Sequence, residues 1–284
     1  MSRVAIVTDS ASDLDSTLAA SLGIAIVPLA VSFGDETFKA GVDLSTEAFW
    51  TRMTAPDAPF PKTAASSPGD FQAVYEAAFA AGADSVVSIH VAGTLSGTMK
   101  SASVARDLLA DREIHLVDST SASMGEGLLA ELGVELANRG VSAAEIARIL
   151  TERTADLNVF VALDTLEYLK RGGRISGAQA AIGTLLSVKP IITIKDGKVE
   201  ATERVRTRSK AIERVIELLT DRPVERLAIL STPPSEATAF REAVIARMSG
   251  GIDPASVTVQ VVGPSVGPHL GPGCLGGVLL YRRE

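Results

Sequence analysis

Short apolar runs alternate with amphipathic segments along the first half of the chain. The runs have the length and composition of buried strands and cover residues 4–7, 24–33, 85–89 and 113–118. Between them, apolar side chains recur about every 3.6 positions, as at Phe71, Tyr75 and Phe79, which predicts helices. A long helix is predicted to end near Arg139. This alternation predicts a mostly parallel sheet with helices on both faces.

Helix boundaries are marked by residues that cap helices. Ser45, Ser67 and Ser142 each precede a helical pattern, and Pro68 stands at a first helical position, where its missing N–H has no cost. Glycine follows several helical patterns, as Gly23 does. These signals predict where the helices of the first half begin and end.

The pattern changes near residue 158. A strand at 159–163 and a short helix at 165–170 precede a mildly apolar segment, 176–186, that is rich in Ala and Gly. Asp196-Gly197 then joins two apolar-rich runs, the strongest short-range signal for a β-hairpin. Helices near 208–219 and 235–248 and strands near 226–231 and 256–262 complete this part. We therefore predict an N-terminal α/β domain, residues 1–157, and a C-terminal α+β domain, residues 158–284.

Composition limits the class of protein. The 284 residues are 46% apolar and 21% charged, with a formal net charge of −7 and no long basic block, which argues against nucleic-acid binding. Cys274 is the single cysteine, so no internal disulfide can form. The start lacks a signal-peptide pattern, and no apolar run reaches about 20 residues. We expect a soluble cytoplasmic protein without a transmembrane segment.

Polar turns follow three predicted strands, after Val7, Ile89 and Val117. Because ligands of parallel sheets bind beyond the carboxyl ends of strands, these turns are expected to converge. The second turn, residues 93–98, contains two glycines and three hydroxyls at the start of a helix. Either Ser96 or Thr98 merely caps this helix, or the turn binds an anion.

Many catalytic signatures are absent from the sequence. It has no P-loop, Gly-x-Ser-x-Gly, His-Glu-x-x-His or Cys-x-x-Cys pattern. His90 and His115 lie in apolar strands and are expected to be packed residues, whereas His269 lies in a loop rich in glycine and proline. We therefore expect neither a metal site nor a cofactor. Hydroxyls, arginines and His269 leave both an enzyme and a binding protein open.

Several motifs occur in an order that resembles the DegV family across essentially the whole chain, and its characterised members are bacterial fatty-acid-binding proteins of the FakB type. These motifs are Thr8-Asp9-Ser10-Ala11-Ser12-Asp13-Leu14, Leu95-Ser96-Gly97-Thr98, Val117-Asp118-Ser119, the stretch 163–175 with Gly172-Gly173-Arg174, Lys189-Pro190-Ile191, and the loop 263–273 around His269.

The resemblance implies two α/β domains with a long-chain fatty acid between them. Such a protein is a lipid carrier rather than an enzyme, and it presents the fatty-acid carboxylate to a separate kinase of the dihydroxyacetone-kinase-like class. The kinase makes acyl-phosphate, which feeds phospholipid synthesis. Transient membrane contact is compatible with this role. The missing P-loop agrees with a protein that has no nucleotide site of its own.

Site residues are assigned by matching the motifs of the family. The carboxylate-binding positions match Thr63, Ser96 and Gly97, and the positions for transfer or partner contact match Arg174, Arg204, Arg206 and His269. We expect Arg174 and His269 to lie on loops at the domain boundary, away from the wall of the acyl tunnel. The chain departs from the family pattern at Ala64-Ala65, Ala92-Gly93 and Met99, which changes the donors available to the head group.

Two other interpretations remain open at this point. An enzyme acting on a small phosphorylated or hydroxylated substrate would use His269 as acid or base and would have a small polar pocket. A structural or regulatory module without a ligand would use Ser96 and Thr98 only as helix caps. The carrier hypothesis predicts instead a dry apolar cavity that ends at Thr63 and Ser96.

Overall fold

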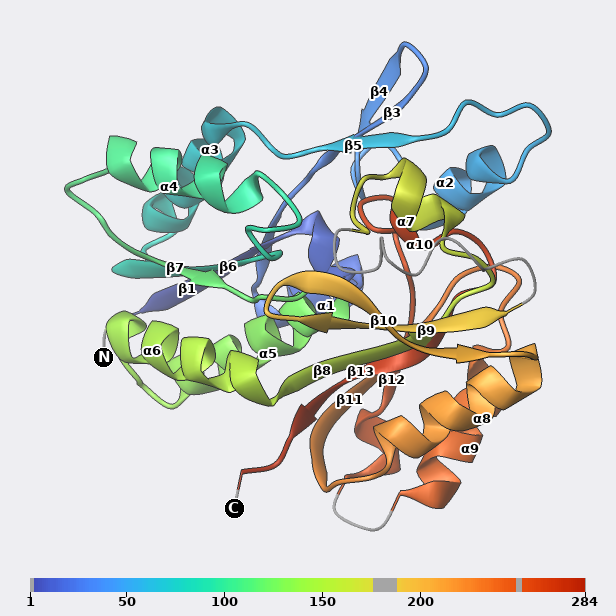
Figure 1. The fold of residues 1–284 in the computed structure, drawn as a ribbon. Coiled ribbons are helices and arrows are strands. Elements are labelled where there is room, and N and C mark those ends of the chain that lie inside the picture. The colour runs from blue at the N-terminus through green and yellow to red at the C-terminus, as the bar shows by residue number, and fades with distance from the viewer. Residues whose placement is uncertain (1–2, 176–187, 249–251, 284) are drawn as a thin grey trace.

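The computed structural model describes residues 3–175, 188–248 and 252–283, so the whole segment 176–186 singled out above lies outside the described residues. The chain folds into a mixed α/β structure with three sheets (Figure 1). The first sheet is parallel, with the order β2-β1-β6-β7. Its strands are β1 (Val4–Asp9), β2 (Ala25–Val27), β6 (Ser85–His90) and β7 (Glu113–Asp118). The predicted parallel sheet is confirmed.

Helices cover both faces of this sheet. The helices α3 (Pro68–Ala80) and α4 (Thr98–Leu108) pack on one face, and α5 (Met124–Asn138) and α6 (Ala143–Arg153) pack on the other. The short helix α1 (Ser16–Leu22) lies beside β2 and ends at Gly23, whose φ of 70° suits glycine. Apolar side chains of α3, such as Phe71 and Tyr75, are fully buried against the sheet. The predicted amphipathic pattern therefore matches the packed faces.

The predicted capping residues cap their helices. Ser45 begins α2 (Thr46–Met53) and accepts a hydrogen bond from the backbone N–H of Ala48. Ser67 begins α3 in a capping box with Asp70, and Ser142 begins α6. Each side-chain oxygen satisfies an N–H that has no partner within its helix.

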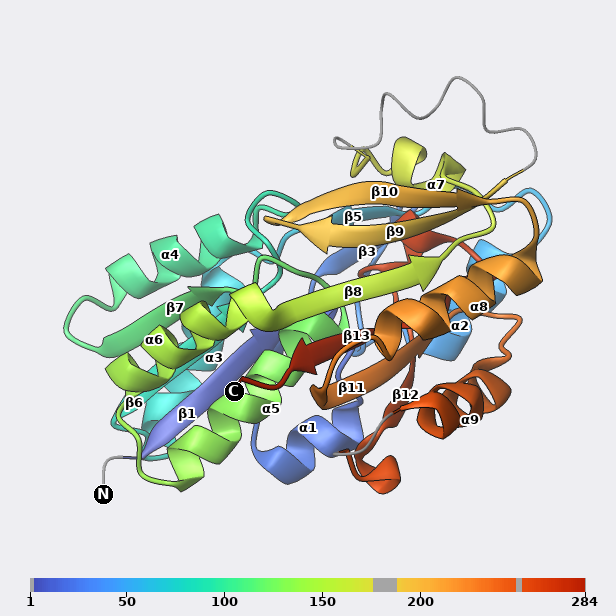
Figure 2. The same ribbon diagram turned by 60° about the horizontal axis from the view of Figure 1, so that its bottom comes forward.

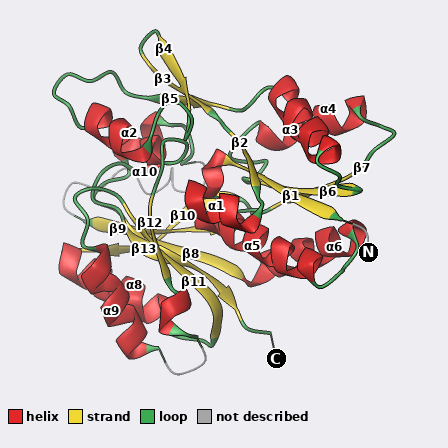
Figure 3. Cartoon of the chain, turned by 180° about the vertical axis from the view of Figure 1, so that it is seen from behind, coloured by secondary structure: helices red, strands yellow, loops and turns green. Residues whose placement is uncertain are grey.

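A small antiparallel sheet, with the order β4-β3-β5, was not predicted (Figure 3). Its strands are β3 (Ala30–Phe33), β4 (Glu36–Lys39) and β5 (Lys62–Ala64). The apolar run 24–33 was expected to form one strand, but it divides at Pro28 into β2 and β3, which belong to different sheets. Proline has no N–H to donate to a ladder, so it interrupts the strand here.

The second half of the chain forms a six-stranded sheet with the order β10-β9-β8-β13-β11-β12. Neighbouring strands are antiparallel except β11 and β12. The hairpin between β9 and β10 turns at Asp196 and Gly197, both with positive φ, as the sequence predicted. The strands are β8 (Leu157–Ala162), β9 (Lys189–Lys195), β10 (Lys198–Val205), β11 (Val224–Ser231), β12 (Thr258–Val261) and β13 (Leu275–Tyr281).

Helix α5 lies between the parallel and the six-stranded sheets (Figure 2). It packs on β1 and β6 on one side and on β8, β11 and β13 on the other, so it is buried around most of its circumference. Helices α8 (Arg208–Leu219) and α9 (Ala237–Arg247) cover the far face of the six-stranded sheet. The described strands of this sheet come from residues 157–281 and those of the other sheets from residues 4–118. The division into two domains at 157/158 remains a prediction.

Candidate ligand-binding site

A largely apolar cavity lies at the centre of the molecule, and we call it the central cavity. Its empty volume is about 740 Å³ with the open mouth included. Its walls come from both halves of the chain, since Leu29, Val91 and Ala122 precede residue 157, and Val161, Ile192 and Leu230 follow it. Because most of the lining is aliphatic, the cavity suits an apolar chain better than a compact polar ligand.

Six polar side chains lie in the wall of the central cavity, and four of them are residues singled out from the sequence: Thr63, Ser96, Arg174 and His269. Thr63 comes from β5, Ser96 from the loop before α4, Arg174 from the segment after α7 (Glu167–Arg171), and His269 from the short helix α10 (Gly267–Leu270). The structure thus brings together four residues that are up to 206 positions apart, as the Thr63–His269 contact shows.

His269 forms a hydrogen bond with Thr63, with 3.1 Å between Nε2 and Oγ1. Burial and then the nearby charge of Arg174 lower the pKa of His269 to about 4, so the imidazole is neutral at pH 7. Nδ1 is buried without a hydrogen-bond partner among the described residues. Since an unpartnered acceptor is cheaper than an unpartnered N–H, the proton belongs on Nε2, which donates to Thr63. The hydroxyl proton of Thr63 then remains available to a ligand.

Gly172 makes the position of His269 possible. A Cβ at Gly172 would lie 2.1 Å from His269 Nδ1, so no other residue fits there without displacing the ring. Arg174 follows two residues later, and its Nη1 donates to the carbonyl of Gly172 at 2.6 Å. Its Nε donates to the carbonyl of Leu95 at 3.1 Å. The Gly172-Gly173-Arg174 motif therefore leaves room for the His269 ring and anchors the loop that carries Ser96.

Ser96 does not cap α4, contrary to one of the two interpretations of this turn. The N-cap of α4 is Gly97, which has no side chain, and Thr98 is already the first helical residue. Ser96 Oγ instead lies 2.8 Å from Thr98 Oγ1 and accepts a long hydrogen bond of 3.3 Å from the N–H of Thr98. Ser96 lines the cavity, whereas Gly97 lies outside its lining.

Two expectations about the remaining site residues need correction. Arg174 and His269 were expected to lie off the cavity wall on loops, but both line the cavity, and His269 belongs to a short helix. The glycine-rich breaks were interpreted as loops, but Gly172-Gly173 forms a turn after α7 and Gly267-Pro268 begins α10. Arg204 and Arg206 lie exposed at the end of β10 and do not line the cavity.

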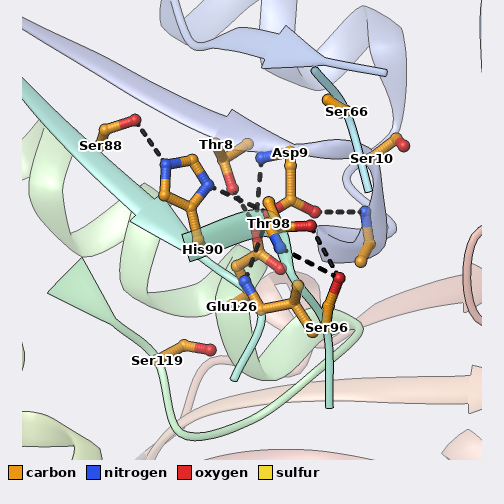
Figure 4. A network of polar contacts seen from close by, with 12 residues as sticks. Thr8, Asp9, Ser10, Ser66, Ser88, His90, Ser96, Thr98, Ser119 and Glu126 are labelled. Atoms are coloured by element: carbon orange, nitrogen blue, oxygen red, sulfur yellow. Dashed lines mark hydrogen bonds and ion pairs between the residues drawn. The ribbon is translucent and has the colours of Figure 1, made fainter. Parts of the chain in front are cut away.

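The three polar turns converge, as predicted, in a buried network (Figure 4). Asp9 Oδ2 lies 3.0 Å from His90 Nδ1, and His90 Nε2 lies 2.7 Å from Ser88 Oγ. Glu126 Oε1 accepts hydrogen bonds from Thr8 Oγ1 at 2.6 Å and from the N–H of Asp9 at 3.1 Å. These bonds tie β1, β6 and α5 together beneath the loops of the site.

Burial and then the charge of Asp9 raise the pKa of Glu126 well above its usual range. Asp9, His90 and Glu126 are donor types that also occur in cation sites, and their ligand atoms lie within 4.8 Å of one another. These three residues are already linked to each other and to the backbone by hydrogen bonds. The expectation that the protein binds no metal stays a prediction. His90 is a packed residue, as expected.

His115 differs from the expectation of a packed residue. Its side chain is 32% exposed and pairs with Glu113 across 3.0 Å. Both residues lie on the same face of β7, an edge strand of the parallel sheet, whereas the neighbours Ile114 and Leu116 lie on the opposite face and pack with α3 and α4. The apolar neighbours of His115 in sequence therefore face the core while His115 itself faces outward.

Sequence reasoning did not identify a second group of hydroxyls at the cavity. Ser123 and Ser265 line the wall, and Ser10 Oγ lies 2.8 Å from Ser265 Oγ. Asp13 holds this region together, because it accepts hydrogen bonds from Ser123 Oγ and from the N–H of Gly263. Burial raises the pKa of Asp13. Ser10 and Asp13 lie in the motif 8–14, and this motif was the sequence signal that could have revealed the second group of hydroxyls.

The DegV family model, described as one of uncharacterised proteins, matches residues 3–282. A DegV domain-containing protein of Streptomyces coelicolor is 36% identical over 99% of this chain and 100% of the relative. The chain belongs to the DegV family. Protein DegV of Bacillus subtilis is 31% identical over 96% of this chain and 98% of its own length.

Solved structures of DegV proteins share this fold. A fatty-acid-binding DegV protein of Thermus thermophilus superimposes with a TM-score of 0.89 at 35% identity, covering 99% of this chain and 100% of its own. DegV of Bacillus subtilis, a fatty-acid-binding protein, gives 0.87 at 30% identity over 99% and 100%. A stearic-acid-binding protein of Eubacterium ventriosum gives 0.86 at 28% identity over 99% and 98%. All three structures are of proteins described as binding fatty acids.

Among the described residues, no helix combines the length and the apolar composition needed to cross a bilayer.

Proposed function

We propose that this protein is a fatty-acid carrier that holds a long acyl chain in the central cavity. The observation that carries the proposal is a largely apolar cavity with Thr63, Ser96, Arg174 and His269 gathered in its wall. Three structures with 28–35% identity, described as fatty-acid-binding proteins, support it. Burial of each CH₂ group stabilises the complex by about 0.8 kcal/mol, so the acyl chain supplies most of the affinity.

These four polar side chains favour a ligand whose head group is a carboxylate. Thr63 keeps a hydroxyl proton free to donate, because His269 Nε2–H occupies its acceptor position. Ser96 supplies a second hydroxyl, and Arg174 supplies a positive charge that no carboxylate neutralises within the described residues. Hydrogen bonds to an ionised carboxylate are short and about twice as strong as those between neutral groups. Gly97 lies just outside and shapes the loop rather than binding the head group.

The carrier acts as the binding subunit of a fatty acid kinase system of the FakB type. A partner kinase of the dihydroxyacetone-kinase-like class holds ATP, and a carboxylate oxygen forms a bond to the γ-phosphorus while the bond to ADP breaks. The carrier then passes the acyl-phosphate to phospholipid synthesis in the cytoplasm, with transient membrane contact at most. Arg204 and Arg206 are exposed beyond the cavity and make no ion pair among those described, so they suit contact with the kinase.

If the carrier works with a kinase, a variant of the kinase-facing surface should keep fatty-acid binding and lose acyl-phosphate formation. The double variant Arg204→Ala/Arg206→Ala should bind fatty acid as the wild type does, because neither residue lines the cavity. Its kinase-dependent formation of acyl-phosphate should fall by about tenfold or more at limiting carrier concentration, since surface charges mainly steer association. A fluorescent fatty-acid titration and a coupled ADP assay measure the two quantities.

The control is Arg112→Ala, which removes an exposed arginine from the loop between α4 and β7. This variant should leave the fatty-acid affinity and the rate of acyl-phosphate formation unchanged. ATP turnover by the carrier alone would contradict the proposal, as would an unchanged rate in the double variant.

A further inference from the structure

A second concave region adjoins the central cavity, and we call it the outer hollow. Its empty volume is about 1030 Å³ with open solvent included, and it is lined by the loop 93–97, by Met99 and Lys100 of α4, and by Gly173 and Arg174. Leu95, Ser96 and Arg174 line both the hollow and the cavity. A head group held at Ser96 and Arg174 therefore faces the hollow directly.

Three hydrogen bonds hold the walls of the outer hollow in place. Thr94 Oγ1 donates to the carbonyl of Gly197 at the tip of the β9–β10 hairpin. Arg174 Nε donates to the carbonyl of Leu95, and the N–H of Ser96 donates to the carbonyl of Ala92. Gly93 and Gly97 carry no side chain, so a ligand can approach the backbone closely there.

The charge of the hollow is positive. Lys100 is exposed and has no ion pair among the described residues, and Arg174 bonds only backbone carbonyls there. Asp118 lies behind Gly93, but its carboxylate accepts hydrogen bonds from the N–H groups of Gly93 and Thr120, at 3.1 and 2.8 Å. Two cations thus remain to attract an anion larger than the carboxylate.

We propose that the outer hollow binds the phosphoryl group of an acyl-phosphate, with Lys100 and Arg174 as its cationic partners. The inference rests on the proposed function, because the acyl chain must occupy the central cavity for its head to reach the hollow. The carboxylate of a fatty acid ends at Ser96 and does not reach Lys100. A phosphoryl group added to that carboxylate extends into the hollow, where planar guanidinium and ammonium donors match phosphate oxygens. Lys100 therefore distinguishes the phosphorylated ligand from the free fatty acid.

The test compares two ligands with the same long chain: the fatty acid and a hydrolysis-resistant acyl phosphonate. Calorimetric titration of the delipidated full chain gives both dissociation constants. In Lys100→Gln the fatty-acid constant should stay within about twofold, and the phosphonate constant should rise about fivefold or more. Lys100→Arg should retain the phosphonate affinity. The difference should shrink at high salt, because an exposed charge pair is screened.

The matched control is Lys210→Gln, which removes an exposed lysine of α8 that does not line the hollow. Equal phosphonate affinities for Lys100→Gln and Lys210→Gln would overturn the inference. An equal loss for both ligands in Lys100→Gln would also overturn it, because Lys100 would then act on the carboxylate. A wild-type protein that binds no fatty acid would refute the proposed function itself, a result distinct from both.

Discussion

Single residues decide the polarity of the candidate site. Thr63, Ser96, Arg174 and His269 are the polar side chains that meet near the loop 93–97, whereas aliphatic side chains make most of the remaining wall. Local sequence alone did not assign Thr63 a role, because a threonine in a loop has no distinctive pattern. The family resemblance singled it out, and the contact with His269 now gives it a physical partner. The removal of a hydroxyl is therefore the most informative change at this scale.

We expect Thr63→Ala and Ser96→Ala each to weaken binding of a long-chain fatty acid by about 10- to 150-fold, since each removes a hydrogen bond to a charged group worth about 1.5–3 kcal/mol. The affinity of the fatty alcohol of equal length should change much less. Because the pKa of His269 is about 4, its ring stays neutral from pH 6 to 8 and both differences should persist across that range. Fluorescence titration measures them.

Ser21→Ala is the control, since it removes an exposed hydroxyl from α1. Unchanged fatty-acid affinity in both site variants, with the fold intact by circular dichroism, would refute the head-group assignment.

At the scale of elements, local signals worked where the cause is local. Ser45, Ser67 and Ser142 cap their helices because a cap depends on the next few residues only. Asp196-Gly197 turns the hairpin for the same reason. The sheet of β3, β4 and β5 escaped prediction because its strands are three or four residues long and pair across up to 34 positions. Such pairings depend on tertiary packing rather than on a period in the sequence.

The junction of α7 with α10 gives a prediction about element packing. Gly172→Ala should lower the free energy of unfolding by about 1–3 kcal/mol, because the new Cβ overlaps the ring of His269. In a His269→Ala background the ring is absent, so the same change should cost about half as much or less. Urea unfolding of the four proteins of this cycle measures both costs.

Gly69→Ala is the matched control, since its Cβ would meet nothing closer than 3.7 Å at the start of α3. It should change the stability by less than about 1 kcal/mol. Additive effects of Gly172→Ala and His269→Ala would show that the glycine is not required by the imidazole.

At the scale of the whole molecule, the central cavity forms where residues distant in sequence meet. Its walls include Ala11 and Leu29 from the start of the chain and Val266 and Leu270 from its end. Periodicity predicted the parallel sheet and the hairpin that supply these walls, but not that they would enclose a cavity. Only the ordered set of motifs, through the DegV resemblance, pointed to a ligand between the two halves. Helix α5 packs against strands of both large sheets and so connects the two halves of the chain.

The central claim is that the cavity holds a fatty acid, and mass spectrometry of an organic extract from the purified full chain tests it most directly. We expect about one long-chain fatty acid per wild-type chain. Ala122→Phe, which places a ring in the cavity, should lose this lipid, whereas Ala20→Phe on the exposed side of α1 should keep it. A wild-type extract without fatty acid, or an Ala122→Phe protein that carries the wild-type amount, would contradict the account.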